Sequence, residues 1–296
     1  MLKESCGTIR ENFGIIKERY MKIITLSALL FTLASPAFAN NITAAAHPPI
    51  GEKGYALQID NRLIAQSASI LVDSKGDEIK SKSSLMSNLL IGRVFIPGWM
   101  FRVSVPYTQS ESGVNQRSAF GDVITEAGLS DEWNGWHYRA LMYVNIPGKY
   151  DPARTLNVGA GAWSIGPNLS FTRYLADKKY NVSAWAQYAV NFTNPDTQVK
   201  AGNIFSYAVA ATAQIEAGVP MLVGVEQRGL VGDPNTVDGS AGTNKAKQQF
   251  SAGPVMMINL GKFMPGFTLW PTAQYDFYNR NTSRLSLYYL KLQYVW

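Results

Sequence analysis

Hydrophobic and polar residues alternate along most of the chain after residue 54. Between Trp99 and Tyr107 every odd position is apolar or aromatic, and between Tyr180 and Thr193 every even position is. Most of the intervening positions in the second segment carry Asn, Ser, Gln or Thr. Successive side chains of a β-strand point to opposite faces, so this pattern predicts strands with one apolar and one polar face.

Segments of this kind repeat to the end of the chain and predict about twelve strands. An even number is typical of single-chain bacterial barrels. The predicted strands span residues 54–67, 84–95, 98–108, 119–130, 134–147, 161–175, 179–193, 202–217, 219–230, 247–260, 265–279 and 282–296.

The connections between these segments alternate in length. Such an alternation is typical of outer-membrane barrels, in which short turns lie on the periplasmic side and long loops on the outer side; both termini are then periplasmic. A short connection at 280–281, where a long one is due, is a departure from it. Long connections are predicted near 68–83, 109–118, 148–160, 194–201 and 231–246, and short ones at 97–98, 131–134, 176–178, 217–218 and 261–265.

Composition places the apolar faces in lipid. Charged residues make up 16% of the chain, whereas a soluble domain carries about 25%. Aromatic residues lie near both ends of several apolar faces, the position that Trp and Tyr take at membrane interfaces. An open sheet edge in lipid would leave backbone groups unpaired, so the sheet must close. The sequence therefore predicts an all-β, transmembrane antiparallel up-and-down β-barrel.

The last predicted strand ends the chain on an aromatic residue. Bacterial outer-membrane barrels resemble this, because their insertion machinery reads an apolar alternating last strand that ends in Phe or Trp. The alternative is a closing core strand of a soluble fold. The candidate insertion signal is formed by Tyr288, Leu290, Leu292, Tyr294 and Trp296.

The amino-terminal part predicts export. Residues 21–39 have a basic start at Lys22, an apolar stretch and the small-x-small pattern Ala37-Phe38-Ala39, as in a cleaved signal peptide. Residues 1–20 are interpreted as an extension from an upstream start codon, 40–53 as a periplasmic leader and 54–296 as the barrel. Cleavage would remove Cys6, the only cysteine.

Charge and residue counts exclude several classes of function. The chain has two His and one Cys, which leaves too few ligands for a His/Cys metal site. The net charge of +6 is small and spread thinly, so a nucleic acid is not expected as a partner. No cofactor is predicted. The expected partners are the lipid bilayer, the insertion machinery and a small-molecule solute, and the oligomeric state is left open.

The polar faces supply the candidate site, on the side of the strands that carries Arg102. We interpret this side as the lumen. Two hypotheses stay open for it: a structural network that packs the interior, or a constriction that selects solutes by charge and size. The candidates are Arg102, Asp122, Glu126, His137, Arg139, Asn168, Gln187, Glu226, Arg228 and Asp276, with Trp185, Trp270, Tyr278 and Tyr289 as possible stacking surfaces.

Four short motifs resemble a known family. They are Phe120-Gly121-Asp122-Val123, Trp136-His137-Tyr138, Pro147-Gly148-Lys149-Tyr150-Asp151 and Asn157-Val158-Gly159. They are similar to the outer-membrane family labelled "meta-pathway of phenol degradation". The resemblance implies a barrel that admits small hydrophobic or aromatic compounds. It assigns no catalytic residues, so none is carried over.

The sequence therefore favours an outer-membrane channel for passive uptake of such compounds. A non-conducting structural or adhesive barrel is the alternative, with a lipid hydrolase third. A Ser–His mechanism needs a histidine beside the nucleophile, and the chain offers only His47 and His137 and no Gly-x-Ser-x-Gly elbow. The protein is not expected to be an enzyme.

Overall fold

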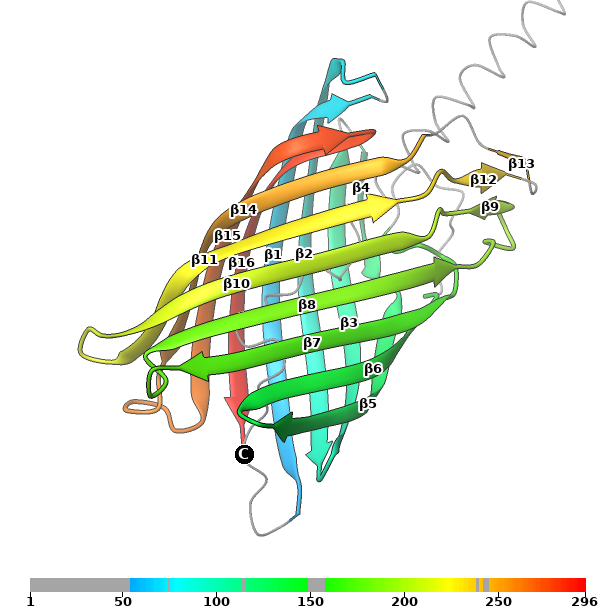
Figure 1. Cartoon of the computed structure of the whole chain (residues 1–296). Helices are drawn as coiled ribbons and strands as arrows, with labels where there is room; N and C mark the ends of the chain where they lie inside the picture. Colours follow the sequence, from blue (N-terminus) through cyan, green and yellow to red (C-terminus); the bar gives the residue numbers. More distant parts are fainter. Residues whose placement is uncertain (1–53, 74, 113–114, 149–157, 238–239, 242–244) are drawn as a thin grey trace, which may run out of the picture.

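The computed structural model describes residues 54–73, 75–112, 115–148, 158–237, 240–241 and 245–296. Its main sheet closes on itself, since β1 pairs with both β2 and β16, and β2 also pairs with β3. Every pairing is antiparallel, and the ribbon forms a tilted barrel (Figure 1). The twelve-strand antiparallel barrel expected from the sequence is confirmed.

The barrel strands follow the chain order around the ring. One position is shared by β4 and β5, which both pair with β3 and are separated by Gly121 and Asp122. The bounds are β1 Ala56–Val72, β2 Glu78–Ile96, β3 Trp99–Ser112, β4 Asn115–Phe120, β5 Val123–Trp133, β6 Trp136–Ile146, β7 Ser164–Leu175, β8 Tyr180–Asn191, β10 Ile204–Glu216, β11 Pro220–Gly232, β14 Lys247–Asn259, β15 Phe267–Arg280 and β16 Thr282–Val295.

Short turns lie at the end of the barrel where β1 begins and β16 ends, which we call the terminal end (Figure 1). Asn134 and Gly135 both have positive φ, at 51° and 74°. Asn-Gly is the preferred pair for a two-residue hairpin turn of this kind. Gly98, with φ 74°, serves the preceding hairpin of this end. The five short connections predicted from the sequence at 97–98, 131–134, 176–178, 217–218 and 261–265 therefore all lie at this end.

The opposite end, which we call the loop end, differs from the prediction at two connections. The segments 68–83 and 109–118 are mostly strand, because β1 and β2 extend to residues 72 and 78, and β3 and β4 to 112 and 115. The polar residues in these segments indicated exposure to water, and loops were therefore predicted. Outside the membrane, however, neighbouring strands can still form backbone hydrogen bonds when neither of their faces is apolar. The loop end also carries a small sheet of β9 (Val199–Lys200), β12 (Thr236–Val237) and β13 (Ser240–Ala241).

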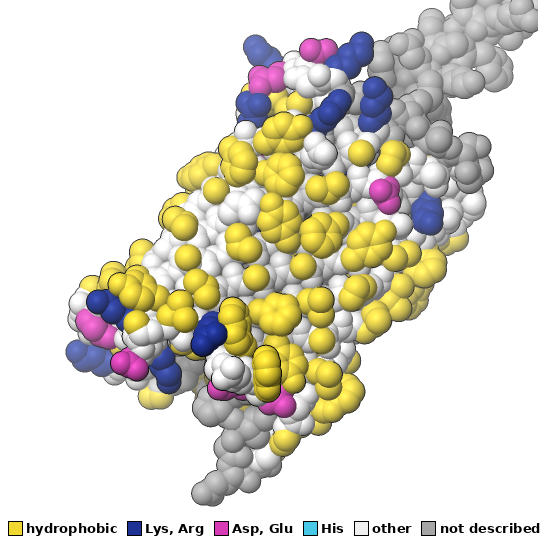
Figure 2. All heavy atoms as spheres, viewed as in Figure 1, with side chains coloured by type: hydrophobic (Ala, Val, Ile, Leu, Met, Phe, Trp, Pro, Cys, Tyr) yellow, Lys and Arg dark blue, Asp and Glu magenta, His cyan; other side chains and the backbone are white. Residues whose placement is uncertain are grey.

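The outer wall is apolar over the middle of the barrel, and charged residues gather at both ends (Figure 2). Outward-facing side chains such as Leu90 and Val103 are about half exposed, at 52% and 49%. Exposed aromatic residues form a girdle at each end, as lipid headgroups favour. The loop-end girdle includes Tyr107, Phe120, Phe192, Phe205 and Phe277, and the terminal girdle includes Trp99, Trp133, Tyr180, Phe263 and Trp296.

Glycine allows close backbone approach at one point in the wall. A Cβ added at Gly166 of β7 would overlap the carbonyl oxygen of Tyr188 in β8. The ladder between these strands is irregular here, since the pairing passes from Ile165 directly to Asn168. Pro167 contributes to this gap because it has no N–H to donate. Gly92, by contrast, has open space where its Cβ would lie.

Within the described residues, no helix has the length and apolar character needed to cross a membrane. The predicted signal peptide at 21–39 and the leader at 40–53 lie outside the residues that the structure describes.

Candidate functional site in the barrel lumen

The lumen holds a network of buried charges, and its first part comes from β1 and β2. Asp60 is fully buried and accepts hydrogen bonds from Arg62 Nη2 at 2.8 Å, Arg93 Nη1 at 2.6 Å and Gln58 Nε2 at 2.8 Å. The even positions of β1 point inward, between outward residues such as Ile59 and Leu63, which are about 40% exposed. One carboxylate therefore joins two guanidinium groups.

A second part of the network comes from β3, β5, β6 and β7. Glu126 accepts 2.9 Å hydrogen bonds from Arg102 Nη1 and from Asn168 Nδ2. Arg139 is 9% exposed, and its guanidinium carbon lies 5.4 Å from the ring centre of Phe95. Glu126 and Arg139 interact electrostatically, so these strands share one charge cluster.

The third part comes from β11, β15 and β16. Arg228 forms an ion pair with Glu226, and Gln274 Nε2 lies 3.5 Å from Glu226 Oε1. Lys291 Nζ lies 3.4 Å from the ring centre of Trp270 and donates to Gln293 Oε1 at 3.0 Å. Such a cation–π contact is favourable when the cation is away from water.

These three parts form what we call the lumen network, in which cations outnumber acids. Buried charges are expensive unless they are paired and hydrogen-bonded. The acids are shared between several cations, as Asp60 is between Arg62 and Arg93. The network contains six cations, Arg62, Arg93, Arg102, Arg139, Arg228 and Lys291, and three acids, Asp60, Glu126 and Glu226. The part of the lumen that the network occupies therefore favours anions.

A cavity of about 100 Å³ lies on the loop-end side of the lumen, and we call it the loop-end cavity. Asp122, Gln187, Asn194 and Lys247 line it together with apolar residues. Asp122 accepts from Asn145 Nδ2 at 3.0 Å and from the backbone N–H groups of residues 148 and 160, at 3.0 and 2.7 Å. This carboxylate therefore holds together the two ends of the connection between β6 and β7.

A wider vestibule of about 880 Å³ lies at the terminal end. His137 and Tyr174 line it, with their rings edge-to-face at 5.7 Å, and Glu132 Oε2 lies 3.6 Å from His137 Nδ1. None of the acids of the lumen network lines this vestibule or the loop-end cavity. The acids of the network are therefore separate from both spaces.

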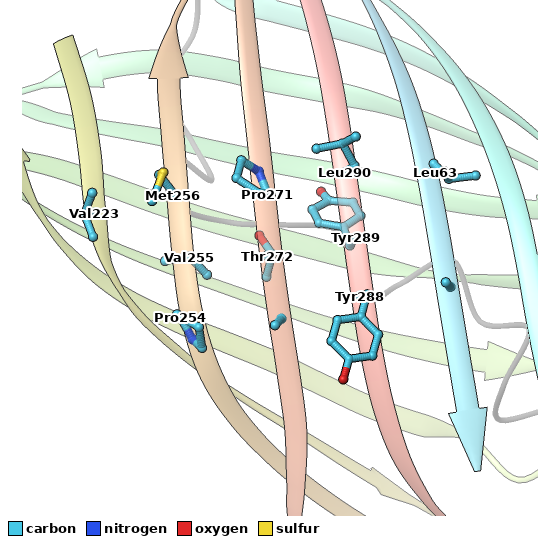
Figure 3. A pocket seen from close by; sticks show the side chains of 12 residues that line it. Leu63, Val223, Pro254, Val255, Met256, Pro271, Thr272, Tyr288, Tyr289 and Leu290 are labelled. Carbon is cyan, nitrogen blue, oxygen red and sulfur yellow. The ribbon is translucent and has the colours of Figure 1, made fainter. Parts of the chain in front are cut away.

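A third space of about 460 Å³ is an apolar groove on the outer wall. Outward residues of β11, β14, β15, β16 and β1 line it, including Val223, Pro254, Pro271, Leu290 and Leu63, with Tyr288 below (Figure 3). Its lining has little polar character, which suits contact with hydrocarbon tails. This groove belongs to the lipid-facing surface and contributes none of the charged groups described above.

The structure places all ten predicted site residues on the inner face. Five belong to the lumen network, with Asn168 bonded to it; Asp122 and Gln187 line the loop-end cavity, and His137 lines the vestibule. Asp276 is separate: it accepts from Gln249 Nε2 at 2.7 Å, Asn279 Nδ2 at 2.9 Å and the N–H of Leu285 at 2.7 Å. It therefore joins β14, β15 and β16.

One aromatic expectation is wrong. Tyr278 is 42% exposed and lies 5.7 Å from Phe250 on the outer face. A register shift places Asp276 opposite Ser251 and Tyr278 opposite Phe250, so an extra residue reverses the alternation. Trp270 and Tyr289 are buried toward the lumen as expected, at 2% and 4% exposure.

The candidate list missed Asp60, Arg62, Arg93 and Lys291, four members of the lumen network. All four lie on inward positions of the predicted strands, and each follows or precedes an outward apolar residue: Ile59, Leu63, Val94 and Leu290 respectively. The same alternation that selected Arg102 would have selected them. No group of three or more His, Cys, Asp or Glu that could hold a metal ion occurs among the described residues.

Comparison with known proteins identifies the fold and the family. The chain is similar to the COG4313 outer membrane channel from Pseudomonas putida F1, with a TM-score of 0.72 and 16% identity, over 87% of this chain and 100% of that one. It is also similar to the beta domain of the Bordetella autotransporter BrkA, with a TM-score of 0.52 and 11% identity, over 81% and 99% of the two chains. Among curated proteins, none matches this chain.

The family profile matches residues 66–292, most of the barrel. It includes the Gly121-Asp122 break and the loop-end cavity residues, so the resemblance seen in the sequence motifs is confirmed. The protein has the fold of an outer-membrane channel, and the chain belongs to the family described as "Putative MetA-pathway of phenol degradation".

Proposed function

We propose that the protein is a passive channel for the uptake of small hydrophobic or aromatic compounds across the outer membrane. The observation that carries this proposal is a polar, charged interior in a barrel that has a separate space at each end. Buried charges cost several kcal/mol each, on the order of 3 to 5 when a partner is lost. A barrel with only a structural role would be stabilised better by an apolar interior.

The solute class is supported by the family description, which names phenol degradation. It is also supported by rings inside the barrel. Tyr143 and Tyr289 are buried toward the lumen, and Tyr143 lines the loop-end cavity, where its ring can stack against a ring-shaped solute. In this proposal the loop end faces the exterior and the vestibule faces the periplasm.

Swelling of liposomes that contain the purified protein tests the proposal. Benzamide, a neutral aromatic compound, should enter faster than it enters liposomes without protein. Removing the Arg102–Glu126 pair, which joins the neighbouring strands β3 and β5 on the lumen wall at 2.9 Å, with a double Ala substitution should increase this rate several-fold. The matched control is the double Ala substitution of Arg284 and Glu78, an exposed ion pair at 2.8 Å, which should leave the rate unchanged.

A non-conducting structural barrel is the second candidate, and one observation favours it. Asp60, Glu226, Arg62 and Arg228 are at most 2% exposed, so these side chains do not border an open water channel in this structure. In that case no solute should enter through the unsubstituted protein or through the variant lacking the Arg102–Glu126 pair. Faster entry through the variant alone would mean that the network closes the lumen.

The route to the membrane is part of the same proposal. An export signal at residues 21–39 would leave Asn40 as the first residue of the mature protein, which amino-terminal sequencing checks. In β16, Tyr288, Leu290 and Leu292 face outward, and Trp296 ends the chain. Deleting Trp296 should reduce the amount of folded protein in the outer membrane if the insertion machinery binds this strand.

A further inference from the structure

The loop-end cavity contains a lysine without an ion-pair partner among the described residues. Lys247 begins β14 and is 3% exposed. Its Nζ has a single hydrogen bond to a described residue, a long one of 3.3 Å to Asn235 Oδ1. That oxygen also accepts the N–H of Gly202 at 3.1 Å. An ammonium group has three donors, so Lys247 can still donate to a ligand.

A second donor lines the same cavity. Asn194 is 3% exposed, and its Nδ2 has no hydrogen-bond partner. The orientation of this amide is determined by the chain, because Oδ1 accepts the N–H groups of Asp196 at 2.9 Å and Thr197 at 3.1 Å. The amide cannot be turned over without losing both bonds. A buried donor without a partner is rare and costly in folded proteins.

The acid in the cavity lining does not supply the missing acceptor. Asp122 accepts three hydrogen bonds, from Asn145 and from the backbone N–H groups of Gly148 and Ala160. Its negative charge is therefore directed at other donors. The cavity lining presents two available kinds of donor, one of them cationic, and this combination is complementary to a carboxylate.

The rest of the lining limits the size and character of a ligand. Val158, Ala189 and Ile204 contribute apolar surface to the cavity. Its volume of about 100 Å³ is smaller than the roughly 150 Å³ of a cavity known to hold benzene. A ligand that fills it has a carboxylate and a short apolar chain.

We propose that the loop-end cavity binds a small monocarboxylate. The carboxylate accepts hydrogen bonds from Lys247 Nζ and Asn194 Nδ2, and the short chain lies against Val158, Ala189 and Ile204. Such a site would make small organic acids a solute class that the loop end selects. This consequence for transport rests on the proposed channel function.

Calorimetry on the full chain in detergent, in chloride-free buffer at pH 7, tests the site with propionate and its neutral analogue propionamide. Propionate should bind at least tenfold more tightly, because hydrogen bonds between charged groups are the stronger ones. Lys247→Met should weaken propionate binding at least tenfold. Asn194→Asp keeps the acceptor for the turn and replaces the donor with a negative charge, so it should abolish binding.

Lys245→Met is the matched control. Lys245 is exposed and lies two residues before Lys247, and its substitution removes the same positive charge. It should bind propionate like the unsubstituted protein. Heat-modifiable gel mobility checks that each variant is folded. Equal affinity for propionate and propionamide, or unchanged binding in folded Lys247→Met, would overturn the proposal.

Transport measured in parallel separates this inference from the channel proposal. If propionate binds but neither propionate nor propionamide enters proteoliposomes, the site stands and the channel proposal fails. If both solutes enter at the same rate and propionate does not bind, the channel proposal stands and the carboxylate site is wrong.

Discussion

Arg93 donates a 2.6 Å hydrogen bond from Nη1 to Oδ2 of Asp60 across the first hairpin of the barrel. In the register of β1 and β2, Arg93 lies opposite Gln58, so the contact is a diagonal one. Both side chains are buried, at 8% and 0% exposure. The pair connects two neighbouring strands from inside the lumen.

Removing the carboxylate of Asp60 should destabilise the barrel. Asp60→Asn leaves Arg62 and Arg93 buried without their shared acid. Breaking a buried ion pair on one side costs about 3 to 5 kcal/mol. The free energy of unfolding, measured by urea titration in lipid vesicles, should fall by about that amount.

Asp77→Asn is the control for this substitution, because Asp77 is exposed in the turn between β1 and β2. It should change the free energy of unfolding by less than about 0.5 kcal/mol. Equal effects of the two substitutions would mean that water screens the Asp60 cluster.

A methyl group at Gly166 should strain the wall of the barrel. Its Cβ would overlap the carbonyl oxygen of Tyr188, so the backbones of β7 and β8 must move apart. Gly166→Ala should lower the free energy of unfolding by about 1 to 3 kcal/mol. Gly92→Ala, where the Cβ would meet open space, should cost little, and a similar loss at both positions would contradict the close approach.

An arginine on the outer wall should be costly in proportion to its depth in the membrane. Leu90 lies within the apolar band and is 52% exposed, whereas Ile79 lies next to the loop-end turn on the same strand and is 49% exposed. Leu90→Arg should destabilise the folded protein by about 2 to 4 kcal/mol, and Ile79→Arg by about 0 to 1 kcal/mol. Unfolding titrations in vesicles measure both, and equal costs would place the two residues in the same environment.

The turn between β1 and β2 should lose order in acid. Asp73 Oδ1 accepts hydrogen bonds from three backbone N–H groups, those of Asp77 at 2.9 Å, Lys75 at 2.7 Å and Gly76 at 2.9 Å. These bonds, first among them the one from Asp77, lower the pKa of the Asp73 carboxyl below its usual 3.8. Because the pKa is lowered by folding, the ionised Asp73 carboxylate stabilises the turn fully above about pH 3.8. This stabilisation is lost as the pH falls through the pKa of Asp73 in the folded protein. The protection factor of the Gly76 amide, its exchange rate relative to an unstructured amide at the same pH, should therefore stay constant down to about pH 3.8 and fall at lower pH. A fall that is already complete near pH 5 would contradict these bonds.

Alternation predicted the strands and the inner face well, because the two faces of each strand meet different solvents. Arg102, Glu126 and Arg139 could be placed in the lumen from parity alone. Their partners could not, because register between strands decides that Glu126 meets both Arg102 and Asn168. The pairing of Asp60 with Arg93, 33 positions apart, depends on the same register.

Two kinds of error had local causes. The strand ends at 68–83 and 109–118 were missed because polar residues there mark exposure to water and not the end of backbone pairing. Tyr278 was assigned to the wrong face because one extra residue in β15 reverses the alternation. The donors of the loop-end cavity come from strand ends and loops, where no periodicity indicates direction; Lys247 and Asn194 are examples.

The reversal potential of single channels in a planar bilayer under a gradient of KCl measures the ion selectivity of the lumen. Six cations against three acids in the lumen network predict discrete conductance steps with a preference for chloride. Glu126→Gln should strengthen that preference. Absence of any conductance from folded protein, or a preference for potassium that Glu126→Gln leaves unchanged, would contradict a cation-rich channel.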